Sequence, residues 1–212
     1  MSAFKKERYW SKYAAIYDDY AEYVMGKGLR LLLIEKLSGE RDLREVIEFG
    51  CGTGYYTKAI ARNASRVLAT DLSDEMLDKA KANLKEFPNV TIEKADCEGA
   101  AYPPERFDTV IMANVLHIIE DPRKALRESL RILKKGGLLI VISYTDYGMK
   151  WYDKMQLGMR YFLTFGVPPP WGLRNFSPEA LQSIVEGSGF IIEELELIGE
   201  QSGAIYVKGR KS

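Results

Sequence analysis

Short apolar runs alternate with segments of helical periodicity along most of the chain. Runs at residues 46–49, 66–70, 90–95, 107–113 and 138–144 are typical of buried strands. Apolar positions at residues 55–64, 74–86 and 122–133 recur at helical spacing. Such alternation predicts helices packed on a mostly parallel sheet. A last helix after Ser177 and two closing strands at 190–198 and 204–209, expected to form a hairpin, complete the pattern.

The first apolar run ends in a turn with glycines at alternate positions, Gly50, Gly52 and Gly54. Glycines lack a Cβ atom, so the backbone of such a turn can approach a ligand closely. A dinucleotide-binding G-x-G-x-x-G turn would need glycine at position 55, where Tyr55 stands. The lysine of a phosphate-binding P-loop is also missing. These residues therefore favour a ligand without a pyrophosphate.

Two acidic residues flank the predicted ligand position. Glu48 precedes the glycine turn, and its charge suits a ligand with a cationic end. Asp71 closes the second apolar run, where an acid reaches the ribose hydroxyls in nucleoside-binding sheets. The ligand that these residues imply is a nucleoside with a positively charged tail.

The segment from Glu48 to Gly54, with sequence EFGCGTG, resembles the first motif of class I S-adenosylmethionine-dependent methyltransferases. Further matches follow in the family's order. They are Asp71-Leu72-Ser73 with Met76-Leu77, Ala95-Asp96-Cys97-Glu98, Phe107-Asp108 leading to Asn114-Val115-Leu116-His117, and Leu133-Lys134-Lys135-Gly136-Gly137. The chain is most similar to the small-molecule type-11 group, which resembles quinone-biosynthesis C-methyltransferases. The resemblance covers residues 9–145 well and the remainder loosely.

This resemblance implies a fold and a cofactor. The fold is α/β, a Rossmann-like, doubly wound, mostly parallel seven-stranded sheet with an antiparallel strand at one edge. The cofactor is S-adenosyl-L-methionine, and the product is S-adenosyl-L-homocysteine. Residues 1–212 would form a single methyltransferase domain. The positive end of the helix at 55–64 is expected to favour the cofactor carboxylate.

The resemblance also assigns candidate cofactor-binding residues. Asp96 is expected near the adenine amine, Cys97 contributes mainly its backbone, and Met76 contacts the adenine face or simply packs. The full set is Tyr13, Tyr17, Glu48, Gly50, Cys51, Gly52, Gly54, Asp71, Leu72, Met76, Asp96, Cys97, Asn114 and Val115.

Two aromatic segments lie outside the core pattern. Residues 1–25 are expected to form an N-terminal lid helix, or an ordinary helix packed on the sheet edge. Residues 145–176 are rich in aromatic residues and methionine, and so long a connection needs a reason. We expect a cap over an apolar acceptor pocket, although a helix buried against the N-terminal helix fits as well. A dimer interface or weak contact with a membrane surface are further interpretations of the same segment.

The catalytic residues are less well determined than the cofactor site. His117, the single histidine, and Tyr144 are the candidates, with Asp146 and the N-terminal tyrosines as alternatives. His117 fits a general base, a residue shaping the methyl-transfer pocket, or a structural residue. A base is required only if the nucleophile keeps its proton at neutral pH.

The amino-acid composition limits which partners we expect the protein to bind. Basic and acidic residues balance at 30 each, which disfavours a nucleic-acid substrate. We expect no transmembrane segment, no signal peptide and no metal site, since two cysteines lack a histidine cluster. A cytoplasmic location and a monomer or homodimer fit these features.

The expected function is methyl transfer from S-adenosylmethionine to a small, partly apolar acceptor by in-line displacement. The alternatives are a methyltransferase-like binding or scaffold module and a protein or RNA methyltransferase. An NAD-dependent or nucleotide-sugar enzyme is disfavoured by Tyr55.

Overall fold

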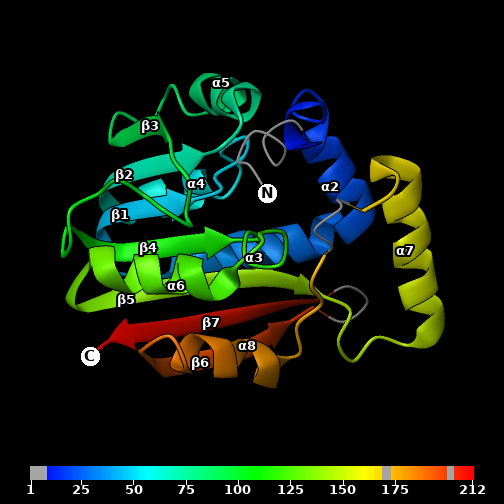
Figure 1. Cartoon of the computed structure of the whole chain (residues 1–212). Coiled ribbons are helices and arrows are strands. Elements are labelled where there is room, and N and C mark those ends of the chain that lie inside the picture. Colours follow the sequence, from blue (N-terminus) through cyan, green and yellow to red (C-terminus); the bar gives the residue numbers. More distant parts are fainter. Residues whose placement is uncertain (1–8, 169–172, 200–202) are drawn as a thin grey trace.

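The computed structural model describes residues 9–168, 173–199 and 203–212. It confirms the predicted α/β class: a seven-stranded sheet has helices on both faces (Figure 1). The strands are β1 (Arg44–Phe49), β2 (Ala64–Asp71), β3 (Val90–Lys94), β4 (Phe107–Ala113), β5 (Leu133–Thr145), β6 (Phe190–Ile198) and β7 (Gly203–Lys211). The helices are α2 (Tyr17–Met25), α3 (Lys27–Gly39), α4 (Thr57–Ala61), α5 (Asp74–Asn83), α6 (Pro122–Ile132), α7 (Trp151–Phe165) and α8 (Pro178–Glu186).

The strand order is β3-β2-β1-β4-β5-β7-β6. Strands β1 to β5 pair in parallel, and β7 pairs antiparallel with both β5 and β6. The predicted antiparallel end of the sheet and the closing hairpin are thereby confirmed. The chain winds outward in both directions from the β1–β4 pair, so the carboxyl ends of these two strands form the topological switch point, where ligands bind in such sheets.

Alternation along β1 separates two cores. Val46 faces the core that includes α3, α4 and α5, whereas Ile47 and Phe49 face the core with α6 and α8. Glu48 lies on the same face of the strand as Val46, because side chains alternate with a period of two. An acid of the glycine motif is therefore directed into a core rather than out of the sheet end.

Side-chain caps fix three helix starts where the sequence predicted them. Ser73 accepts from the Met76 amide at 3.2 Å. Asp121 and Ser177 accept in the same way at α6 and α8, and each of these helices begins with a proline. The helix expected at 55–64 is shorter than predicted: residues 52–56 form turns, and α4 spans only Thr57–Ala61.

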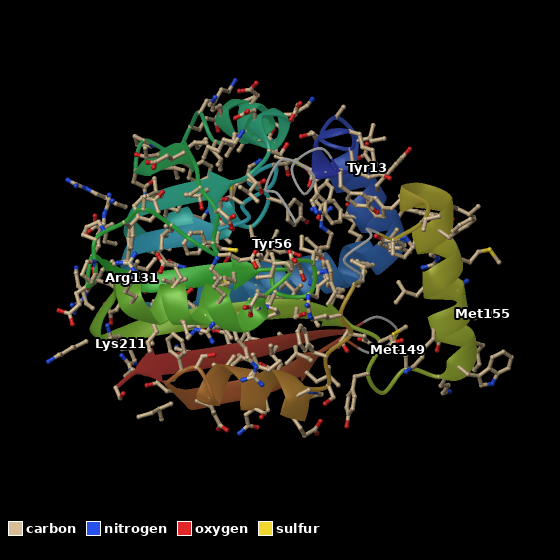
Figure 2. All side chains as sticks on the ribbon, in the orientation of Figure 1. Tyr13, Tyr56, Arg131, Met149, Met155 and Lys211 are labelled. Atoms are coloured by element: carbon tan, nitrogen blue, oxygen red, sulfur yellow. The ribbon has the colours of Figure 1, made fainter. Side chains whose placement is uncertain are left out.

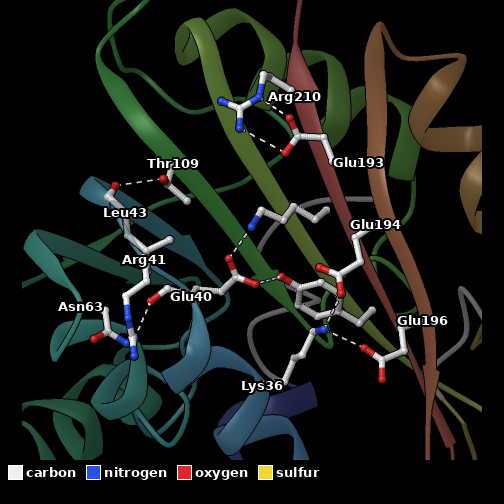
Figure 3. Close-up of polar contacts among 12 residues, drawn as sticks. Lys36, Glu40, Arg41, Leu43, Asn63, Thr109, Glu193, Glu194, Glu196 and Arg210 are labelled. Atoms are coloured by element: carbon white, nitrogen blue, oxygen red, sulfur yellow. Dashed lines mark hydrogen bonds and ion pairs between the residues drawn. The ribbon is translucent and has the colours of Figure 1, made fainter.

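A polar network ties α3 to the antiparallel end of the sheet (Figure 3). The buried carboxylate of Glu40 accepts from the Tyr206 hydroxyl and the Lys208 ammonium, both at 2.6 Å. Lys36, one turn earlier, donates to Glu194 at 2.6 Å and to Glu196 at 2.7 Å. The C-terminal half of α3 is thus fixed to β6 and β7, which fixes the position of its N-terminal half.

Helix α7 stands apart from the sheet, beside α2 (Figure 1). Phe165, near its C-terminal end, is its buried residue. The Phe165 ring lies 5.1 Å from that of Tyr13 and 6.0 Å from that of Tyr20, centroid to centroid. The expectation of a helix simply buried against the N-terminal segment is therefore wrong for most of α7. Across the described ranges, no helix combines the length and apolar character needed to cross a bilayer.

Candidate functional site

A cavity opens at the carboxyl ends of β1, β2 and β4, with an empty volume of about 1030 Å³ including its mouth. Eleven residues predicted from the sequence line this cavity. They lie at or after the carboxyl ends of the parallel strands β1 to β5 or belong to the N-terminal segment. They are Tyr17, Gly50, Cys51, Gly52, Asp71, Leu72, Met76, Cys97, Asn114, Val115 and Tyr144. The predicted residues thus converge although they are spread over more than 120 positions of the chain.

The three glycines of the turn have different roles. All three have positive φ angles, +71° at Gly50, +54° at Gly52 and +82° at Gly54. A Cβ at Gly50 would lie 2.3 Å from a Val115 methyl group, and one at Gly54 would lie 2.7 Å from Leu84. A Cβ at Gly52 would meet nothing within 4 Å. Gly50 and Gly54 therefore permit close packing, whereas Gly52 leaves free space along the cavity wall.

Asp71 holds the turn in place. Its Oδ2 accepts from the Gly52 amide and its Oδ1 from the Ser73 amide, both at 3.0 Å. Burial raises the pKa of Asp71, and the backbone hydrogen bonds oppose that rise. On the other side of the cavity, Asn114 has a φ of +62°, and its Oδ1 accepts from the Tyr144 amide at 3.0 Å. Asn114 therefore fixes the start of the loop after β4 to β5.

Glu48 does not line the cavity. It is buried, and its Oε2 accepts from the Thr57 hydroxyl at 2.6 Å. Burial raises the pKa of Glu48 to about 7, because the charged carboxylate is removed from water and Asp71 lies nearby. In this structure the acid supports the turn from beneath.

Three other predicted residues also lie outside the cavity lining. Tyr13 donates its hydroxyl to the Phe165 carbonyl at 2.6 Å, which links the N-terminal segment to α7. Gly54 packs on α5, as described above. Asp96 accepts from the Glu98 amide at 2.9 Å, while its neighbours Ala95 and Cys97 line the cavity.

Arg30 is a charged residue of this cavity that was not predicted from the sequence. Its side chain is buried, with 2% of the residue exposed. The guanidinium donates to the Asp18 carbonyl at 2.6 Å and to Asp18 Oδ1 at 2.9 Å, and it stacks 3.5 Å from the Tyr55 ring centroid. Among the described residues, Arg30 Nε has no hydrogen-bond partner. No motif marks Arg30, since it lies 20 positions before the glycine turn in a leucine-rich helix.

A buried cation therefore lies beside the glycine turn. The sequence had predicted that the positive end of a helix at 55–64 would favour the cofactor carboxylate. Residues 52–56 are turns, and the five-residue α4 begins behind them. Among the described residues that line this cavity, Arg30 carries the positive charge that can meet a carboxylate.

A second cavity, with an empty volume of about 1330 Å³ including its mouth, lies between α7 and the end of β5. Its walls are mostly apolar and aromatic, with a few polar groups. They include Trp10, Met25, His117, Asp146, Lys154, Leu157, Gly158, Tyr161, Phe162, Phe165, Arg174 and Asn175. Residues 169–172 of the predicted cap segment and residues 1–8 of the predicted lid lie outside the described residues.

The two cavities share a wall of five residues, Trp10, Tyr17, Ala21, Ile118 and Tyr144. The Tyr144 hydroxyl lies 2.9 Å from that of Tyr56 in the first cavity. Burial raises the pKa of both Tyr17 and Tyr144, so each keeps its proton at neutral pH. Neutral phenols and aliphatic side chains therefore separate the two cavities.

His117 lies on the second cavity rather than the first. Its ring centroid is 6.3 Å from that of Tyr144. Burial lowers the pKa of His117 to about 4, so the imidazole is neutral at pH 7. Within the described part of the chain, its Nδ1 is buried without a hydrogen-bond partner. An unpaired polar atom in an apolar cavity is costly, and it suits a group supplied by a ligand.

Known proteins with a similar sequence include methyltransferases. Residues 47–141 match a family model described as "Methyltransferase domain". Demethylmenaquinone methyltransferase of Tropheryma whipplei (strain Twist) is 28% identical over 170 residues, which cover 79% of this chain and 69% of that protein. Malonyl-[acyl-carrier protein] O-methyltransferase of Halalkalibacterium halodurans is 31% identical over 163 residues, covering 73% of this chain and 60% of that protein.

Solved structures show the same fold. A SAM-dependent methyltransferase from Aquifex aeolicus superimposes with a TM-score of 0.70 at 19% sequence identity, covering 95% of this chain and 98% of that chain. The sheet order and the site at its switch point thus define the chain as having a class I methyltransferase fold. Residues 47–141 therefore match a methyltransferase domain, and the chain is similar in sequence and in fold to S-adenosylmethionine-dependent methyltransferases.

Proposed function

We propose that the protein transfers the methyl group of S-adenosylmethionine to a small, partly apolar acceptor bound in the second cavity. The observation that carries this proposal is the common wall: two cavities of different character meet at Tyr17 and Tyr144. A donor in the first cavity and an acceptor in the second would therefore lie next to each other. Holding two reactants in contact supplies much of the acceleration of a displacement reaction.

The residues of the first cavity fit the cofactor. Gly52 leaves free backbone space, Asp71 lies where ribose hydroxyls are bound in such folds, and Met76 offers an apolar contact for a base. Arg30 offers a buried positive charge and a free Nε donor for the carboxylate of the amino-acid part. We extend the predicted site to include Arg30, and we place Tyr13, Glu48, Gly54 and Asp96 in supporting roles behind it.

The residues of the second cavity would orient the acceptor. When bound, S-adenosylmethionine supplies a methyl group that its sulfonium makes electrophilic. The chain itself excludes water with aromatic side chains and presents neutral His117 as a hydrogen-bonding group. Because its pKa is low, His117 is neutral at pH 7, so one of its two ring nitrogens donates a hydrogen bond and the other accepts one. His117 and Tyr144 would therefore position a hydroxyl, thiol or amine of the acceptor, and His117 could receive its proton.

The N-terminal segment and the 145–176 segment would serve as the lid and cap of this acceptor cavity within one domain. Tyr9 and Tyr161 face each other with their hydroxyl oxygens 3.4 Å apart. Together with the ring contacts of Phe165 to Tyr13 and Tyr20, this joins the two segments. An acceptor would enter by displacing the largely aromatic contacts between the lid and α7.

A substitution at Gly158 tests the assignment of the second cavity. Gly158 lies on α7 and lines this cavity, and a Cβ built there meets nothing within 4 Å. The Cβ of Gly158→Phe fits without a clash, and its ring is expected to occupy the acceptor space. The substitution also removes a helix-destabilising glycine. We expect transfer of labelled methyl groups to the organic extract of a host lysate to fall at least tenfold, while S-adenosylhomocysteine binding is unchanged.

Gly158→Ala is the matched control, because it changes the helix in the same way and leaves the cavity open. His117→Phe complements it: the ring volume is kept and the polar atoms are lost, so transfer should fall with cofactor binding unchanged. Full transfer activity in Gly158→Phe would refute the assignment. Label found only in macromolecular material would refute the small-molecule acceptor.

A further inference from the structure

The outer face of α7 is apolar and exposed to solvent. Six large apolar side chains of the helix lie on this face: Trp151, Tyr152, Met155, Met159, Phe162 and Leu163. These six, and the flanking Tyr147 and Val167, are 42–75% exposed. Figure 2 places Met155 on the side of α7 away from the sheet. These six helix residues form the α7 outer face.

Helix geometry separates most of this face from the one that lines the second cavity, and Phe162, near one edge of the arc, belongs to both. At about 100° per residue, the six residues fall within an arc of roughly 120°. Leu157, Tyr161 and Phe165 lie on the opposite side of the helix and line the cavity. A helix that is apolar on two faces is normally buried on both, yet α7 is covered on one. The outer face therefore calls for a partner.

Charge identifies the chemistry of that partner. Lys150 precedes the helix, and Lys154 and Arg160 flank the two edges of the apolar arc. Asp153 is the acidic residue of this helix. Lys154 is partly neutralised by Asp146 at 3.3 Å, whereas Lys150 and Arg160 lie over tyrosine rings at 5.7 and 5.9 Å. Aromatic residues flanked by basic residues are typical of helices that lie in the interface of anionic membranes.

A second copy of the chain fits this face less well. A two-fold symmetric dimer places the same patch against itself, and a patch with more basic than acidic residues cannot pair its own charges. An anionic lipid surface accepts the apolar arc and pairs with the basic flanks at the same time. We propose that α7 seats the enzyme on an anionic lipid surface, with the outer face in the lipid and the second cavity directly behind it.

This surface goes beyond the proposed function, and its test needs neither cofactor nor acceptor. The protein is mixed with phosphatidylcholine vesicles, with or without phosphatidylglycerol, and the bound fraction is measured by sedimentation. We expect the partition coefficient to rise roughly tenfold or more with the anionic lipid. Trp151→Ser/Met155→Gln/Leu163→Gln should lower it roughly tenfold or more. These three residues line neither cavity, so S-adenosylhomocysteine binding should be unchanged.

The control removes three exposed apolar residues elsewhere. Leu31, Ile191 and Leu197 are 50%, 61% and 42% exposed on α3 and β6, and their replacement by glutamine should leave vesicle binding intact. Lys150→Glu should reduce binding to anionic vesicles alone. Equal binding to neutral and anionic vesicles, or unchanged binding of the α7 triple variant, would overturn the proposal. So would a lack of vesicle binding combined with a dimer that the same triple variant dissociates.

Discussion

Replacing Arg30 with methionine would remove the buried cation of the first cavity while keeping a long apolar side chain. The guanidinium is held by Asp18 and Tyr55, and its Nε is free among the described residues. A hydrogen bond to a charged group contributes about 1.5–3 kcal/mol, and about 1.4 kcal/mol corresponds to a tenfold change in affinity. Arg30→Met should therefore raise the Kd for S-adenosylhomocysteine roughly 10- to 100-fold.

The cost to folding should be much smaller. The Asp18 side chain is 37% exposed, so water can replace the lost guanidinium, and Thr53 still donates to its Oδ2 at 2.8 Å. The large cost of removing one partner of a buried ion pair comes from a charge left buried without a partner, and the exposed Asp18 carboxylate is not left in that state. We expect the free energy of unfolding to fall by about 1 kcal/mol.

Titration calorimetry with two ligands separates recognition from damage to the site. S-adenosylhomocysteine carries the carboxylate, whereas 5′-methylthioadenosine has the same nucleoside without the amino-acid part. The variant should lose affinity for the first ligand and keep it for the second. Arg30→Lys should fall between, because a lysine keeps the charge and loses the fork of donors. An equal loss for both ligands, or no loss for S-adenosylhomocysteine, would refute the role of Arg30.

Four further predictions concern the support of the site. Gly50→Ala should lower the free energy of unfolding by about 1–3 kcal/mol in urea titrations. Position 50 has a positive φ, and the new Cβ would collide with Val115. Gly52→Ala, with open space around its Cβ, should cost less stability than Gly50→Ala and lose more cofactor affinity. The pKa of Glu48 rises from the ordinary 4.5 to about 7 in the folded protein, so stability should fall as pH rises through this window, by up to about 3 kcal/mol. Glu48→Gln should remove that dependence in melts between pH 5 and pH 8, and an unchanged slope would contradict it. Glu40→Gln should cost about 1–3 kcal/mol, because the half-buried Lys208 loses its ionic partner, and a melting temperature equal to wild type would refute this.

The sequence alone determined the frame of the fold and most of the first cavity. Short apolar runs, capping residues such as Ser73, and turn glycines act through local backbone geometry, so their pattern is legible along the chain. The doubly wound, mostly parallel sheet was then implied by the family resemblance. For this reason the convergence of Asp71, Met76, Cys97 and Asn114 on one cavity could be predicted from the motifs and their order along the chain.

The tertiary structure decided which side chains complete the site. Arg30 reaches the cavity because the network at Glu40 fixes α3 against β7, a contact between residues 166 positions apart. Glu48 faces a core because side chains alternate between the two faces of β1, and its burial there raises the pKa of its carboxyl group. The second cavity forms because Phe165 packs the C-terminal end of α7 against the N-terminal tyrosines, while the rest of α7 lies away from the strand ends. Long-range packing of this kind has no local signature, since it depends on which surfaces meet once the sheet has formed.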